Sequence, residues 1–217
     1  FKIDGYNLCS DTQCQVYSDP RSASESVRAA IEATRGRFLT WQNKPISAVY
    51  HATNGGVIAD VTEAWAMDSV PYLKPKLDGT DEWINQFSLP LKNDSSVSSL
   101  LHSRIGAYGT YHSRFRWTRT MNAMQVEQSL ASVVKGFKGP KEIKVLKRGP
   151  SGRVLALEIK RNDLNDPVVL RLDSIRRIFR QLPSTLFIVK PESKGVWKFV
   201  GGGFGHGAGL SQAGAID

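Results

Sequence analysis

The stretch Phe199–Gly214 constrains the fold of this chain most strongly, because glycine dominates its first half. The apolar run Val196–Val200 leads into it like a strand, and Ser211 stands where an N-cap would open a helix. Glycine reaches backbone conformations barred to other residues and lets the backbone approach a ligand closely. We therefore predict one wall of a binding cleft, with His206 as its projecting polar group, rather than a flexible tail. Glycines stand at positions 201, 202, 203, 205, 207 and 209.

A dinucleotide site is the first alternative, because Gly203, Gly205 and Ala208 satisfy the spacing G-x-G-x-x-A after a strand. That fingerprint also requires a following helix, a second strand and an acidic residue about 20 positions further on. The sequence after Ala208 contains none of these in order, so we reject a nucleotide-binding reading.

Size and charge narrow the classes of function. A chain of 217 residues can bury a sizeable core, and no run of it is long and apolar enough to cross a membrane. The formal net charge of +9 favours anionic partners such as nucleic acid, anionic lipid or an acidic cell-wall polymer. Nucleic acid is disfavoured, because no aromatic residues are interleaved with the basic ones and no known module is visible. The sequence begins at Phe1 without an initiator or signal peptide, so we expect a piece of a longer protein.

Two cysteines, Cys9 and Cys14, lie close together near the start of the sequence. Such a pair forms either a local disulfide or half of a metal site. Zinc would need two further ligands, and no histidine lies nearby. The disulfide is favoured for a chain outside the cytoplasm, and both readings stay open.

The remaining pattern mixes strands and helices without regular alternation, which favours an α+β fold of mainly antiparallel strands with a few helices around a central cleft. A capping box at Ser22 and Glu25 predicts a helix that ends before Gly36. Further helices are predicted over residues 121–134 and 174–180, the latter capped by Asp173. Strands are predicted over residues 37–41, 46–50, 142–147, 153–159, 168–172, 186–189 and 196–200, with turns over 42–45, 149–152 and 192–195.

The second candidate wall of the cleft follows the strand that ends at Tyr50. There, the turn residues Asn54-Gly55-Gly56 leave His51 and Thr53 at the end of the strand. Further along, Glu63 and Trp65 form either a sugar-binding pair or a solvated carboxylate next to a core tryptophan. Residues 78–116 show no clean periodicity, residues 93–99 look like a loop, and the region of about 80–120 is interpreted as an insertion or lid in a single domain.

Three motifs in this order resemble one family, the SpoIID/LytB domain of stage II sporulation protein D and the amidase enhancers. The resemblance spans nearly the whole chain and is weakest from about residue 80 to 140, and the terminal glycine-histidine motif is its most specific part. The motifs are Cys14-Gln-Val-Tyr17; Tyr50-His-Ala-Thr-Asn-Gly-Gly56 leading through Glu63 and Trp65 to Pro71-Tyr-Leu73; and Leu182-Pro-Ser-Thr-Leu-Phe187 with Gly203-Phe-Gly-His-Gly-Ala-Gly-Leu-Ser-Gln212.

The resemblance implies a bacterial cell-wall protein located outside the cytoplasmic membrane, on the periplasmic or cell-wall side. Sporulation members are lytic transglycosylases that cleave glycan strands stripped of stem peptides, and their mechanism needs one carboxylic acid that donates and then accepts a proton. The family's catalytic glutamate falls upstream of Phe1, which leaves Glu63 as the candidate substitute. The implied substrate-binding residues are His51, Thr53, Gly55, Gly56, Tyr72, Gly205, His206, Gly207, Ser211 and Gln212.

Amidase-enhancer members are described as modifiers of a wall amidase, which gives a second hypothesis: a non-catalytic peptidoglycan-binding module that stimulates such a partner. Some members of the family bind zinc near the cysteine pair, but Gln13 and its neighbours offer no histidine for it. A Ser-His hydrolase with His206 as base and Ser211 as nucleophile is disfavoured, because the sequence has no G-x-S-x-G elbow.

Overall fold

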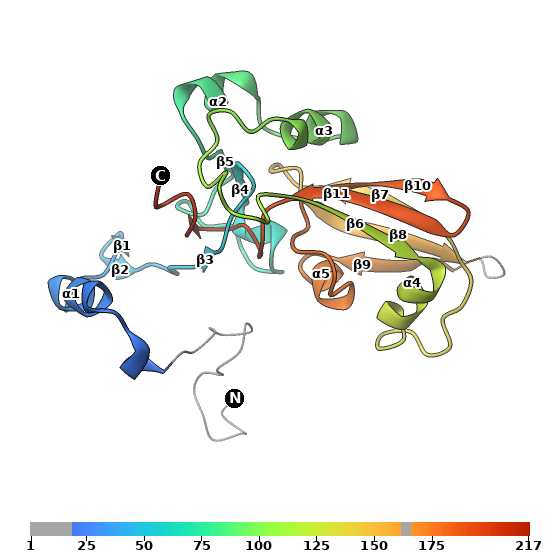
Figure 1. Ribbon diagram of the computed structural model, residues 1–217, viewed down its shortest axis with the longest axis horizontal. Helices are drawn as coiled ribbons and strands as arrows, with labels where there is room; N and C mark the ends of the chain where they lie inside the picture. The colour runs from blue at the N-terminus through green and yellow to red at the C-terminus, as the bar shows by residue number, and fades with distance from the viewer. Residues whose placement is uncertain (1–18, 162–165) are drawn as a thin grey trace. The chain divides into compact units, whose positions relative to one another are not determined.

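The computed structural model describes residues 19–161 and 166–217. The chain divides into two compact units, Phe1–Ile46 and Ser47–Asp217, and each is considered by itself (Figure 1). The predicted disulfide or metal pair, Cys9 and Cys14, lies outside the described residues.

The described part of the first unit, residues 19–46, holds a short 3₁₀ turn, one helix and one small hairpin. Helix α1 spans Glu25–Ala33, and its N-cap is Ser24, whose side chain accepts a hydrogen bond from Val27 N–H. The predicted N-cap, Ser22, was wrong, because this residue ends the 3₁₀ turn η1, Pro20–Ser22, which Asp19 caps instead. Strands β1, Thr40–Trp41, and β2, Lys44–Pro45, pair antiparallel across a tight turn. Positive φ angles at Gln42 and Asn43 mark that turn as type I′.

Two antiparallel three-stranded sheets contain the long strands of the second unit (Figure 1). The predicted hairpin over residues 142–159 is confirmed, and β9 extends it into the sheet β7-β8-β9. The predicted strand pair before the glycine stretch is likewise confirmed in the sheet β10-β11-β6. The strands are β6 Arg116–Asn122, β7 Pro140–Arg148, β8 Val154–Arg161, β9 Val168–Arg171, β10 Phe187–Ser193 and β11 Val196–Gly202.

Four very short strands connect parts of the second unit that lie far apart in sequence. Strand β3, Tyr50–His51, pairs in parallel with β12, Leu210–Ser211. Strand β4, Val57–Ile58, pairs antiparallel with β5, Lys76–Leu77. The strand predicted over residues 46–50 is therefore wrong in extent and in partner, because Lys44–Pro45 closes the hairpin and β3 bonds to the C-terminal end of the unit.

The helices of this unit are short, and two of them correct the sequence analysis. Residues 93–99, expected to be a loop, begin helix α3, Asp94–His102, because the Asn93 side chain caps the Ser96 N–H and Val97, Leu100 and Leu101 are buried on one side. Residues 121–122 end strand β6, so α4 begins at Ala123 and ends at Leu130, earlier than predicted. The others are α2 Asp81–Gln86, α5 Ser174–Ile178 and the 3₁₀ turn η2 Val61–Glu63.

Two hydrophobic clusters hold the second unit together. The larger joins both sheets through α4 and α5, and includes Phe179, Phe187 and Phe199. The smaller packs Trp83 of α2 and Leu100 of α3 against strand residues, so the segment interpreted as an insertion or lid contributes buried side chains. The combination of mainly antiparallel sheets with short helices confirms the α+β class.

Within the described ranges, no helix has the length and apolar character needed to span a membrane.

Candidate functional site

The parallel pair β3 and β12 brings the two predicted cleft motifs together. Ser211 lies opposite His51 in this pair, and an antiparallel bridge joins Thr53 to Phe204 just beyond it. The bridge is closed by Phe204 N–H donating to the Thr53 carbonyl at 2.7 Å. As a result the rings of His51 and His206, 155 positions apart in sequence, lie with their centroids 5.5 Å apart in an edge-on arrangement. The meeting of the two histidines, on which the cleft prediction depended, is therefore present in the structure.

Close approach of two backbones explains the glycines at the bridge. Gly55 has a φ of +75°, and a Cβ atom there would lie 2.8 Å from the carbonyl carbon of Gly202. Gly203 has a φ of +85°, and its Cβ would lie 2.8 Å from the Thr53 carbonyl oxygen. A side chain at either position would need both an unfavourable backbone conformation and a shift of the facing strand. Gly55 and Gly203 thus allow the backbone after His51 and the backbone of the glycine stretch to pack directly against each other.

His51 is buried, with its ring held in one orientation. Its Nδ1 lies 3.0 Å from the carbonyl oxygen of Ala208, which can only accept, so Nδ1 carries the proton. Its Nε2 is buried and has no hydrogen-bond partner in the structure. Burial, with smaller contributions from His206 and Arg153, lowers the pKa of His51 to about 3. This imidazole is therefore neutral at pH 7.

His206 lies between His51 and Trp65 and is only partly buried. Its ring centroid is 4.5 Å from that of Trp65, and its Nδ1 accepts a hydrogen bond from Ala208 N–H at 3.2 Å. Burial lowers the pKa of His206 to about 4, although Asp173 acts in the opposite direction. With its Nδ1 occupied, the neutral ring adds an uncharged aromatic surface next to Trp65.

Arg153 lies beneath the histidines, and the sequence analysis did not identify it. Its side chain is fully buried and donates to the carbonyl oxygens of Val57 and Asn54, each at 3.0 Å, and to the Ser151 hydroxyl at 3.0 Å. Burial lowers its pKa to about 10, so it remains charged at pH 7. The guanidinium therefore ties the turn after His51 to the β7–β8 hairpin, and no sequence pattern distinguishes it from a solvated arginine.

Glu63 is the carboxylate linked to Arg153. Its Oε1 accepts from the Ser151 N–H and hydroxyl, and its Oε2 accepts from Asp60 N–H at 2.8 Å as part of a capping box. Burial raises the pKa of Glu63, while Arg153 opposes this shift. The interpretation of Glu63 as a solvated carboxylate was wrong, because only 1% of the residue is exposed. The same interpretation placed Trp65 in the core, which was also wrong, since Trp65 is only partly buried.

The other predicted site residues have structural hydrogen bonds of their own. The Tyr72 hydroxyl accepts from Ser47 N–H at 3.2 Å. The Ser211 hydroxyl accepts from Gly214 N–H at 3.1 Å, which is a cap-like contact, but only turns follow and the predicted helix does not form. Gln212 donates its backbone N–H to the His51 carbonyl and leaves its side chain exposed.

Phe204 and Arg114 add a further pair next to the bridge that sequence reasoning missed. The Arg114 guanidinium lies 4.1 Å from the centroid of the Phe204 ring. Such stacking of a cation on an aromatic face holds both side chains in place. Arg114 comes from the segment before β6, where the sequence shows no periodicity that would single it out.

No group of three or more side chains that could hold a metal ion occurs in the described part of the chain.

Two family models match the sequence of this chain. Residues 59–209, well over half of the chain, match the family described as "Domain of unknown function (DUF8618)". The chain belongs to the DUF8618 family. A second model, "Stage II sporulation protein", matches residues 2–41 of this DUF8618 member.

Two curated relatives agree with the second match. The "Amidase enhancer" of Bacillus subtilis (strain 168) is 25% identical over 97% of this DUF8618 chain and 32% of its own length. "Stage II sporulation protein D" of Bacillus amyloliquefaciens is 25% identical over 96% of the chain and 53% of its own length. The predicted resemblance to the SpoIID and amidase-enhancer family is therefore confirmed. The chain spans about a third and about half of these two relatives.

Proposed function

We propose that this chain acts in bacterial cell-wall remodelling, on the outer side of the cytoplasmic membrane, by binding the glycan strands of peptidoglycan next to His206. The observation that carries the proposal is the contact between the Trp65 and His206 rings, which lie 4.5 Å apart on two separate walls joined by β3 and β12. Aromatic faces of this kind cover the apolar faces of sugar rings. The names of the two curated relatives supply the wall context.

The charge state of the two histidines supports a polar but uncharged ligand next to His206. The pKa of His51 is lowered to about 3 and that of His206 to about 4, so neither ring carries a charge at neutral pH. Tyr50, the residue before His51 on β3, is 41% exposed and adds a further aromatic side chain to this strand. A neutral, aromatic surface suits sugar hydroxyls and ring faces better than it suits phosphate.

Lytic transglycosylase-type cleavage is the first form of the proposal. It requires a carboxylic acid close to the glycosidic oxygen. Both oxygens of Glu63 are occupied by three protein hydrogen-bond donors inside the core, so this residue supports the fold. In this form of the proposal the acid comes from a part of the longer protein outside these 217 residues.

Stimulation of a partner amidase is the second form, and the locked position of Glu63 favours it for this chain alone. A glycan-binding module needs no acid, and its net charge of +9 attracts it to an anionic wall. The partner would be an amidase that acts on the wall, and the name of the Bacillus subtilis amidase enhancer supports an amidase as the partner.

One set of assays separates these forms. The chain, and the longer protein that contains it, should both sediment with purified sacculi. Mass spectrometry of glycan strands treated with the longer protein should show anhydro-muramyl ends if cleavage is correct. Unchanged strands together with a faster partner amidase would select the enhancer form. Failure to sediment with sacculi would overturn the proposal as a whole.

A further inference from the structure

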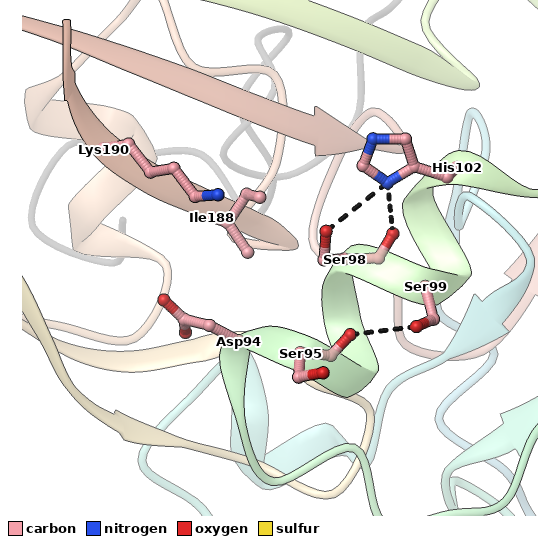
Figure 2. A pocket seen from close by; sticks show the side chains of 7 residues that line it. All are labelled: Asp94, Ser95, Ser98, Ser99, His102, Ile188 and Lys190. Carbon is pink, nitrogen blue, oxygen red and sulfur yellow. Dashed lines mark hydrogen bonds between the residues drawn. The ribbon is translucent and has the colours of Figure 1, made fainter.

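Two cavities that share Asp94 form a groove away from the histidines. The first has a volume of about 490 Å³ and lies between α3 and β10, where Lys190 and Ile188 face the serines of the helix (Figure 2). The second, of about 440 Å³, continues along β7. We call the two together the lysine groove. It is lined by Lys92, Asn93, Asp94, Ser95, Ser98, Ser99, His102, Glu142, Ile143, Lys144, Val145, Leu146, Lys147, Arg148, Ile188, Val189 and Lys190.

The groove carries a surplus of positive charge. Its two carboxylates are already paired: Asp94 accepts two hydrogen bonds from Arg148, and Glu142 accepts one from Lys160 at 3.0 Å. Arg148 is nearly buried and also donates to the Gly152 carbonyl, so it holds Asp94 in place. Four exposed lysines form no ion pair within the described ranges. They are Lys92, Lys144, Lys147 and Lys190.

The chemistry of the lining indicates a phosphate ligand. An ammonium group binds phosphate as a point charge, and hydroxyl groups such as those of Ser95 and Ser98 can donate to phosphate oxygens. The four lysines are divided between the two cavities: Lys190 lines the first, and Lys92, Lys144 and Lys147 line the second. Spread-out cations match a linear polymer with repeated charges better than a single small anion.

Nucleic acid fits this groove poorly. Proteins that bind single strands stack bases on aromatic side chains. No phenylalanine, tyrosine or tryptophan lines either cavity; the apolar part consists of aliphatic residues such as Ile188, Val189 and Leu146. A small, flexible backbone without flat rings is the better match.

We propose that the lysine groove binds a linear polyol-phosphate polymer, that is, phosphodiester groups joined by short hydroxylated carbon chains. This goes beyond glycan binding at His206 and uses none of the same residues. Such a second contact would hold the protein on a wall that carries phosphodiester polymers, while the histidine site contacts the glycan.

The test measures fluorescence anisotropy of a labelled poly(glycerol phosphate) chain on titration with the whole chain. Lys144→Gln/Lys190→Gln removes two cations from the groove. Lys135→Gln/Lys141→Gln is the matched control, because it removes the same charge from exposed lysines outside the lining, one of them on β7 itself. We expect the groove variant to bind about tenfold more weakly and the control to change less than about twofold.

Three results would overturn the proposal: no binding by the wild type at 50 mM salt, equal weakening by both double variants, or tighter binding of single-stranded DNA than of poly(glycerol phosphate). Equal binding of polygalacturonate, a carboxylate polymer, would also contradict phosphate recognition. Sedimentation with sacculi stripped of anionic polymers should be the same for both double variants, which separates failure here from failure of the glycan-binding proposal.

Discussion

The guanidinium of Arg153 lies against Gly207 so closely that a Cβ atom on the glycine would overlap it. Gly207 also has a φ of +81°. The fully buried charge of Arg153 is thus covered by a residue without a side chain. This contact limits how closely the backbone of the glycine stretch approaches Arg153, and it therefore helps to position the neighbouring residue His206.

Gly207→Ala should lower the free energy of unfolding by at least about 2 kcal/mol, because it combines backbone strain with overlap against a buried side chain. Gly136→Ala is the matched control: its φ is +71°, but no atom lies within 4 Å of the added Cβ. That variant should cost only about 1 kcal/mol. Urea denaturation measures both, and equal losses would show that Arg153 yields to the new methyl group.

Glu63 and Arg153 should behave as an energetically coupled pair. Arg153→Met leaves Glu63 buried without its compensating charge, and we expect a loss of about 3–5 kcal/mol in unfolding free energy. Glu63→Gln should cost less, because burial already raises the pKa of Glu63 and favours its neutral form. The double variant should be more stable than the sum of the single losses predicts, by more than about 1 kcal/mol. Additive losses would mean that the Ser151 hydroxyl between them transmits no coupling.

Acid should destabilise the fold through His51. Its pKa is about 3 in the folded chain, below the ordinary 6.5, so the unfolded chain binds a proton first as the pH falls. The stabilisation is complete above pH 6.5 and decreases as the pH drops towards 3, by about 2 kcal/mol at pH 5. His51→Asn should reduce the slope of unfolding free energy against pH between 7 and 5, and the slope that remains is expected from His206, whose pKa is lowered to about 4.

Trp65→Ala should weaken binding to peptidoglycan glycan strands by about tenfold or more, because it removes the ring that lies next to His206. Trp65→Phe should recover much of this loss. Ile105→Ala, which shortens a side chain that is 78% exposed, provides a control for general surface effects. Sedimentation with sacculi measures all three, and wild-type affinity in Trp65→Ala would remove this residue from the site.

Asn93 decides whether residues 94–102 form a helix. Asn93→Ala should cost about 1 kcal/mol in unfolding free energy through loss of the cap on α3, and Asn93→Ser should restore most of it. Thermal denaturation of the three proteins tests this. If Asn93→Ala leaves the stability unchanged, burial of Val97 and Leu100 is sufficient to hold the helix.

The sequence predicted elements that carry their own local signals. The hairpin of β7 and β8 was found because alternating apolar residues flank a glycine-containing turn, and β10 and β11 were found in the same way. The α3 helix was missed because its serines suggest a loop. Its three apolar residues are buried in the same cluster as Trp83 and Phe115, and this tertiary packing is not visible in the local sequence. Local propensity is weak where tertiary burial supplies most of the stability.

The sequence predicted the two segments of the candidate site and their histidines, but not the buried residues that support them. Glycine spacing and the turn after Tyr50 indicated two walls, and the histidines do meet. Arg153, however, has the sequence appearance of any basic residue in a hairpin, and its burial depends on carbonyl oxygens supplied from Asn54 and Val57. Likewise, the pairing of Glu63 with the Ser151 backbone joins residues 88 positions apart, which no local pattern reveals.

The parallel pair of β3 and β12 has a consequence for the order of events during synthesis. Tyr50 and Leu210 are separated by most of the second unit, yet their pairing positions His51. During translation the first wall leaves the ribosome long before its partner exists, so the two histidines cannot meet until almost all of Ser47–Asp217 has emerged. A nascent chain arrested before residue 210 would therefore hold both β-hairpins and still have no site.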